Sequence, residues 1–80
     1  MQPTTADRSL ARDTGRNDAR QALKGLFRGF DPDNWDLSSD AAIQDAAAFV
    51  ADRAVTSRRV SPQLRDTYEE GFANVLRSRM

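Results

Sequence analysis

The sequence predicts an all-α protein, a compact three-helix bundle with an N-terminal arm or a loosely attached helix. Three stretches carry apolar residues at helical spacing, and no stretch alternates apolar and polar residues as a half-buried strand does. A chain of 80 residues is long enough for one domain only. We therefore expect helices at roughly 15–29, 39–56 and 62–77, with residues 1–14 as the arm and 15–80 as a single helical domain.

The first predicted helix is amphipathic over its second half. Continuing it toward the N-terminus, at about 100° per residue, would turn Arg8 and Arg12 onto its apolar face. We therefore expect a break near Thr14 and Gly15, with Thr14 or Asn17 as the N-cap. The apolar face itself consists of Ala19, Ala22, Leu23, Leu26, Phe27 and Phe30.

A connector follows at residues 30–36. Pro32 disfavours helix at the residue before it, and the surrounding Asp and Asn residues are typical of turns. Trp35 is the only tryptophan. In so small a domain we expect it to plug one end of the core, and the alternative is an exposed contact residue.

The second predicted helix starts at Ser38 or Ser39, either of which is a suitable N-cap. Its small side chains predict a close approach to another helix, because small residues shorten the distance between helix axes. The seam consists of Ile43, Ala46, Ala47, Val50 and Ala54, with Ala42 and Phe49 beside it.

The third predicted helix has the clearest start, a serine cap at Ser61 followed by Pro62 at the first helical position. Gly71 lies on its apolar face, where a glycine costs about 1 kcal/mol relative to alanine. We expect a contact there that is too tight for a side chain, against Phe27 or Phe49. The apolar face consists of Leu64, Tyr68, Phe72, Val75 and Leu76.

The charges are segregated although their sum is zero. Residues 1–30 hold six cations against three acids, residues 31–52 hold six aspartates and no cation, and residues 53–80 hold six cations against three acids. Such blocks indicate oriented contacts, within the fold or to a partner. The most regular feature is a row of cations at every fourth position, which are neighbours on a helix: Arg8, Arg12, Arg16, Arg20, Lys24 and Arg28.

No catalytic, cofactor or metal site is predicted. The chain has no cysteine and no histidine, and it carries neither a nucleophile motif nor a glycine-rich phosphate loop. The aspartates at Asp31, Asp33 and Asp36 invite comparison with a calcium-binding EF-hand loop. That pattern fails, because Trp35 and Ala42 stand where oxygen ligands are required and Asp36 stands where glycine is required.

The leading hypothesis is a small non-enzymatic adaptor or inhibitor that binds a larger protein or nucleoprotein through an arginine-rich helix face. By size and lack of motifs it is similar to phage-encoded inhibitors of bacterial defence complexes, such as anti-CRISPR proteins. We expect a cytoplasmic protein, since the chain has no cysteine for disulfides, and no membrane span, since no apolar run is long enough. The predicted contact residues are Arg16, Arg20, Lys24 and Arg28, with Arg8, Arg12 and Trp35 adding to them.

The alternative hypothesis is a small DNA- or RNA-binding regulator, with Arg58 and Arg59 as a second basic cluster. The stretch from Val60 to Phe72 resembles the recognition helix of mercury-resistance-type regulators, which would imply a helix-turn-helix. Arg59 stands where that family has glycine, one residue must be deleted to align the Tyr-Glu pair, and two acids, Asp66 and Glu70, face outward. The sequence therefore assigns the chain to no known family.

Two further hypotheses rest on the middle of the chain. The alanine-rich second helix could pack against its own copy and make a homo-oligomeric module. The acidic segment 31–52 could imitate nucleic acid, with Asp45 and Asp52 one heptad apart on one face. The competing interpretation is that these aspartates are solvated and paired with neighbouring arginines.

Overall fold

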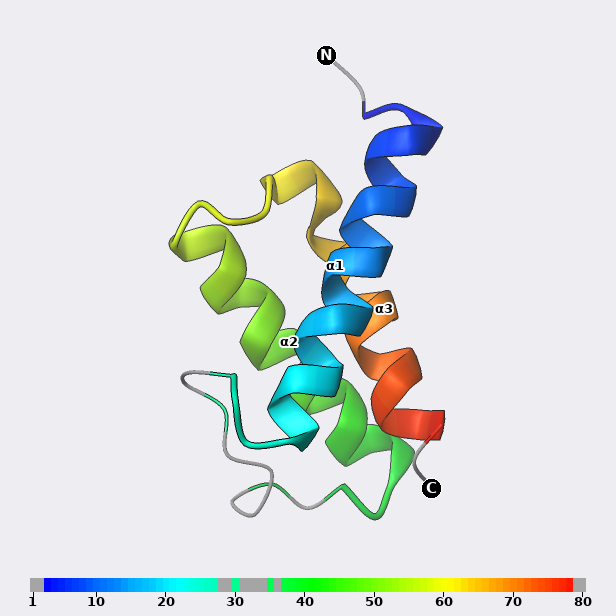
Figure 1. Cartoon of the computed structure of the whole chain (residues 1–80), viewed down its shortest axis with the longest axis vertical. Helices are drawn as coiled ribbons and strands as arrows, with labels where there is room; N and C mark the ends of the chain where they lie inside the picture. Colours follow the sequence, from blue (N-terminus) through cyan, green and yellow to red (C-terminus); the bar gives the residue numbers. More distant parts are fainter. Residues whose placement is uncertain (1–2, 28–29, 31–34, 36, 79–80) are drawn as a thin grey trace.

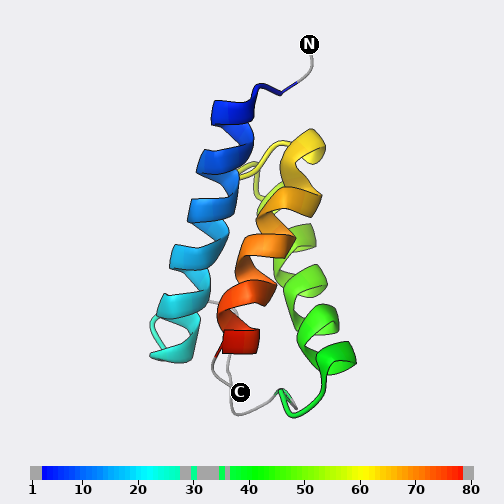
Figure 2. The ribbon, with the colours of Figure 1, turned by 90° about the vertical axis from the view of Figure 1, so that its right-hand side faces the viewer.

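The computed structural model describes residues 3–27, 30, 35 and 37–78. These residues form a bundle of α1 (Thr5–Leu23), α2 (Asp40–Thr56) and α3 (Arg65–Ser78), with a short 3-10 helix η2 (Pro62–Leu64) leading into α3. The three helices lie side by side (Figures 1 and 2), and the described part of the chain contains no strand. The predicted all-α three-helix bundle is confirmed.

Helix α1 begins earlier than predicted, and the expected break near Thr14 and Gly15 is wrong. Thr4 caps the helix, since its hydroxyl accepts the Asp7 N–H while the Asp7 carboxylate accepts the Thr4 N–H, each at 3.1 Å. Most of the predicted arm is therefore the first half of α1. The arginines of this half do not enter the core, because Arg8 is exposed and Arg12 lies at the edge, where it pairs with Glu70. The buried residues of α1 are Ala11, Gly15, Asp18, Ala19 and Ala22.

Helix α1 also ends earlier than predicted, at Leu23 rather than residue 29. Gly25 has a φ of +75°, its N–H donates to the Ala22 carbonyl at 3.0 Å, and the Leu26 N–H donates to the Gln21 carbonyl at 2.9 Å. This is a Schellman motif, which ends a helix at a residue that adopts the left-handed conformation. Leu26, expected on the buried face, is consequently 69% exposed.

Helices α1 and α3 touch backbone to backbone. A Cβ atom added to Gly15 would lie 2.3 Å from the Tyr68 carbonyl oxygen, and one added to Gly71 would lie 2.2 Å from the Arg12 carbonyl oxygen. The tight contact predicted at Gly71 is confirmed, but its partner is the backbone of α1 and neither of the phenylalanines that were expected. The reason is that the predicted first helix omitted the half of α1 that α3 crosses.

Helix α2 packs its small residues inward as predicted. Ser39 caps it, with its hydroxyl accepting the Ala42 N–H at 3.1 Å. At the end of the bundle Phe30 is buried and stacks on the half-buried Trp35, with ring centroids 6.0 Å apart, so that Trp35 covers the core as expected. The buried residues of α2 are Ile43, Ala46, Ala47, Val50, Ala51 and Ala54.

Phe49 departs from the expected inward seam. It is 41% exposed, and its ring lies 5.5 Å from Trp35 and 5.7 Å from the Arg53 guanidinium. Across the described residues, no helix has both the length and the apolar character needed to cross a membrane.

Candidate partner-binding surfaces

The row of cations spirals around α1 toward the C-terminal end of the helix. Four residues advance about 400° on a helix, so each cation is displaced by about 40° from the one before it. Arg12 and Arg16 are half-buried beside the core, whereas Arg20 and Lys24 are exposed on the outer side. Arg28, predicted as the last member, lies outside the described residues.

The inner members of the row are paired within the chain. Arg12 Nε lies 3.4 Å from Glu70 Oε1 on α3, and Arg16 Nη1 lies 3.4 Å from Asp13 Oδ1 one turn earlier. Such exposed pairs contribute only a fraction of a kcal/mol. They nevertheless occupy guanidinium groups that the sequence suggested were available to a partner.

The outer members have no such pairs. The side chains of Arg8, Arg20 and Lys24 make no ion pair or hydrogen bond with any residue in the described part of the chain. Arg16, which is half-buried and pairs with Asp13, lies one turn before Arg20, and Lys24 follows as the C-cap residue of α1. We call the surface formed by Arg16, Arg20 and Lys24 the basic face of α1.

Arg59, predicted as part of a second basic cluster, is a structural residue. Its Nη2 lies 2.9 Å from Oδ2 of Asp18, and the Tyr68 hydroxyl donates to the same oxygen at 2.5 Å. Asp18 is only 6% exposed, so its carboxylate has little contact with water. The two donors supply the hydrogen bonds that water would otherwise make. This site was not predicted, because Asp18 was expected in the first turn of its helix, whereas α1 starts about ten residues earlier, at Thr5.

The environment of this cluster shifts two pKa values upward. Burial and the hydrogen bond to Asp18 raise the pKa of Tyr68, against a smaller lowering by the nearby Arg59 charge. For Arg59, burial acts to lower the pKa, but the hydrogen bond and attraction to Asp18 outweigh it, so the pKa is raised. The cluster is therefore a neutral tyrosine and a charged arginine that share one carboxylate.

Arg58, two residues beyond the last residue of α2, has an unusual backbone conformation. Its φ is +64°, its N–H donates to the Val55 carbonyl at 3.0 Å, and the Arg59 N–H donates to the Ala54 carbonyl at 2.9 Å. These are the bonds of a second Schellman motif, in which glycine is the usual residue. The left-handed conformation costs a residue with a side chain about 1–2 kcal/mol.

A hollow of about 150 Å³ lies between α1 and the connector that joins α2 to α3. Leu10, 68% exposed, forms part of its wall, and the largely buried Val60 forms another part. The hollow was not predicted, because residues 1–14 were assigned to an arm. The full lining comprises Asp7, Leu10, Ala11, Thr14, Arg59, Val60, Ser61 and Leu64.

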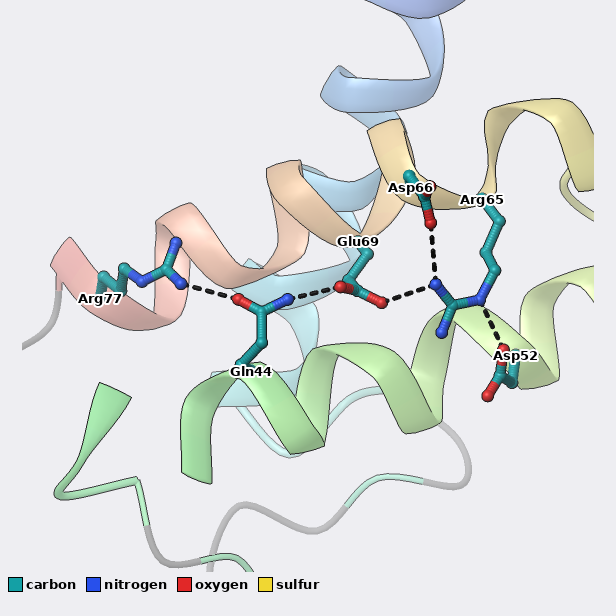
Figure 3. A network of polar contacts seen from close by, with 6 residues as sticks. All are labelled: Gln44, Asp52, Arg65, Asp66, Glu69 and Arg77. Carbon is teal, nitrogen blue, oxygen red and sulfur yellow. Dashed lines mark hydrogen bonds and ion pairs between the residues drawn. The ribbon is translucent and has the colours of Figure 1, made fainter. Parts of the chain in front are cut away.

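A chain of polar contacts joins α2 to α3 (Figure 3). Arg65 Nε lies 2.5 Å from Asp52 Oδ1, and Arg65 Nη1 lies 2.9 Å from Glu69 Oε1. The Gln44 amide donates to Glu69, and Arg77 Nη2 donates to Gln44 Oε1 at 2.7 Å. The hydrogen bond to Asp52 raises the pKa of Arg65 above its ordinary value, against the lowering effect of burial.

This network accounts for much of the acidic block on α2. Asp52 is paired with Arg65, and Asp40 Oδ1 lies 2.6 Å from Arg77 Nε. The interpretation that these aspartates pair with neighbouring arginines is thus confirmed for Asp40 and Asp52. Asp45, which was to share a nucleic-acid-like face with Asp52, is exposed, and the other aspartates of the block lie outside the described residues.

Within residues 3–27, 30, 35 and 37–78, no group of three or more acidic, cysteine or histidine side chains is placed to hold a metal ion. Comparison with protein-family models, with curated proteins and with solved structures gives no match. We therefore infer function from the surfaces of this chain.

Proposed function

We propose that this protein is a small non-enzymatic interaction protein that binds an anionic surface of a larger protein or nucleoprotein through the basic face of α1. The observation that carries the proposal is the exposure of Arg20 and Lys24, which have no ion-pair partner in the described part of the chain. An inhibitor of a bacterial defence complex, such as an anti-CRISPR protein, is the specific form of this proposal.

Geometry supports a contact through this face. Arg20 and Lys24 are four residues apart, so their side chains are neighbours about 6 Å apart along the axis of one helix. Arginine forks suit carboxylates and phosphates alike. A single exposed ion pair contributes at most about 1 kcal/mol, so useful affinity requires Arg16, Arg20 and Lys24 to act together with an apolar contact. The half-buried Trp35 is the predicted apolar contact.

The alternative of direct nucleic-acid binding has weaker support. A DNA-binding domain of this size normally has a strong positive excess, whereas this chain has a net charge of zero. The homo-oligomer proposal has also lost the feature that motivated it, because the alanine seam of α2 is buried inside its own chain.

The proposal is tested by charge reversal with a matched control. Arg20 and Arg53 each occupy the last turn of a helix, and both are exposed. Arg20→Glu and Arg53→Glu therefore change the net charge equally and lose a similar interaction with a helix dipole, about 0.3–1 kcal/mol. Capture of binding proteins from a lysate of the native host is expected to fail for Arg20→Glu and to persist for Arg53→Glu.

Equal capture by both variants would contradict a role for the basic face. Anisotropy with a labelled DNA duplex, at about 50 and 200 mM salt, separates the alternative. Tight binding with a steep salt dependence would favour the nucleic-acid regulator instead.

A further inference from the structure

We propose that the corner between the first half of α1 and the α2–α3 connector docks an acidic segment of a partner protein that carries a leucine-sized side chain beside its carboxylate. This inference rests on the proposed function, since it assumes an interaction protein. It does not depend on Arg20 and Lys24, and it concerns a separate surface, which we call the corner site: the hollow beside Leu10 together with Arg58 and Arg59.

The apolar part of the corner site is the hollow itself. The hollow has a volume of about 150 Å³, which leaves room for one leucine-sized side chain. Leu10 is one of the three large hydrophobic residues that are exposed in the described part of the chain. Val60 and Leu64 complete an apolar wall that an inserted side chain would cover.

The charged part of the corner site is the arginine pair. Arg59 lines the hollow and its side chain is 47% exposed, although one of its nitrogens is bound to Asp18. A guanidinium has five N–H groups, so Arg59 has donors left for a second carboxylate. Arg58 is exposed next to it in the chain and makes no ion pair or hydrogen bond through its side chain within the described residues.

The backbone of Arg58 gives an independent reason to assign it a contact. The chain ends α1 with Gly25 in the left-handed conformation and ends α2 with Arg58 in that same conformation. Glycine at residue 58 would relieve the strain without changing any buried contact. Residues in costly backbone conformations cluster at functional sites, and we assign the exposed Arg58 side chain an anionic partner outside the chain.

The shape of the corner site selects a protein partner. A phosphate backbone has no apolar side chain to place in the hollow, whereas a peptide with glutamate next to leucine offers both groups. Asp7 also lines the hollow, and it would repel a carboxylate. Its carboxylate accepts the Thr4 N–H at 3.1 Å in the cap of α1, so it is held at the N-terminal end of that helix.

The test uses the full chain, labelled with ¹⁵N, and two blocked tetrapeptides, acetyl-Glu-Leu-Leu-Glu-amide and acetyl-Gln-Leu-Leu-Gln-amide. The acidic peptide is expected to produce saturable amide shifts at Leu10, Arg58, Arg59 and Val60 at millimolar concentration, and the glutamine peptide is expected to bind more weakly. Equal binding of the two peptides, or shifts that never saturate, would overturn the proposal.

The decisive variant is Arg58→Gly, because it is expected to raise the melting temperature and to weaken binding. The affinity for the acidic peptide should fall by about twofold to fivefold, the contribution of an exposed ion pair. Arg58→Lys, which keeps the charge, is expected to retain most of the binding. Unchanged affinity in Arg58→Gly would contradict the assignment. A DNA oligonucleotide that shifts the same amides more strongly than the peptide would replace the protein partner with nucleic acid.

Arg20→Glu separates this inference from the proposed function. It is expected to leave the peptide shifts at Leu10 and Val60 unchanged even if it abolishes partner capture. Loss of the peptide shifts in Arg20→Glu would show that the corner site is not a separate surface.

Discussion

The two interfaces of α3 are built on opposite principles. Toward α1, α3 presents Gly71 and approaches so closely that backbone meets backbone, with the buried Asp18 held by Tyr68. Toward α2, apolar packing is bordered by a half-exposed ladder of Arg65, Glu69 and other polar side chains. The first interface depends on the absence of side chains at fixed points, and the second depends on side chains that can adjust. The first should therefore tolerate substitution far less than the second.

The largest expected effect is at the close contact. Gly71→Ala would place a Cβ atom 2.2 Å from the Arg12 carbonyl oxygen, so α1 and α3 must separate. We expect a loss of about 3 kcal/mol or more in the free energy of unfolding, measured by urea denaturation. Gly25→Ala is the matched control, because its Cβ atom would meet nothing within 4 Å and only the positive φ opposes it. It should cost about 1–2 kcal/mol, and equal losses in the two variants would contradict the close contact as the cause.

Removing a donor from the buried carboxylate should have the next largest effect. Tyr68 is fully buried, and its hydroxyl donates to Asp18 at 2.5 Å. We expect Tyr68→Phe to lower the free energy of unfolding by about 2 kcal/mol, the contribution of a hydrogen bond to a charged group. A change below about 0.5 kcal/mol in thermal or urea unfolding would mean that Arg59 alone satisfies Asp18.

The same tyrosine predicts a loss of stability in alkali. Its pKa in the folded chain is raised above the ordinary value of 10.0, by burial first and by Asp18 second. Above about pH 10 the unfolded chain releases this proton while the folded chain keeps it, so stability is complete below that pH and falls as pH rises. Tyr68 is the only tyrosine, so tyrosinate absorbance reports on it directly.

We expect that absorbance to appear only as the circular dichroism signal is lost, and the alkaline decline to be smaller in Tyr68→Phe. Half-ionisation near pH 10 with an intact helical signal would contradict the shielded hydroxyl.

The smallest expected effect is on the adjustable side of α3. Glu69, whose side chain is 15% exposed, joins Arg65 to Gln44. We expect Glu69→Ala to cost about 1 kcal/mol, and less at high salt. Asp66→Ala, which removes a carboxylate that is 93% exposed from the same arginine, should leave the melting temperature unchanged. A Glu69→Ala loss as large as that of Gly71→Ala would remove the contrast between the two interfaces.

Local signals predicted α2 and the start of η2 and α3 well. The Ser39 hydroxyl caps α2, and Pro62 stands at the start of η2, whereas the Ser61 hydroxyl makes no capping hydrogen bond. The alanine seam of α2 faces inward as its spacing indicates. Gly25 could have marked the end of α1, because glycine after a helical run is a stop signal. It was overlooked since the aromatic residues beyond it continued the apolar spacing by coincidence.

The candidate site was predicted in part. Arg20 and Lys24 are exposed as the helical phase indicated, because azimuth on a helix follows from residue spacing alone. Arg12 and Arg59 were assigned to partners outside the chain, and within the chain they pair with Glu70 and Asp18. The members of these two pairs are 58 and 41 positions apart in the chain. Only the tertiary packing brings them together, and residue spacing does not reveal that packing.

By itself the sequence determined the all-α class, the serine cap of α2, the proline start of η2 and the regular row of cations. These features depend on interactions within one or two turns of chain. Only the tertiary structure decided that α1 runs unbroken through Gly15, that Asp18 is buried, and that Arg59 and Leu10 border one hollow. The physical reason is that α1 and α3 meet at a glycine in each helix, Gly15 and Gly71, and this close contact selects which face of α1 is buried.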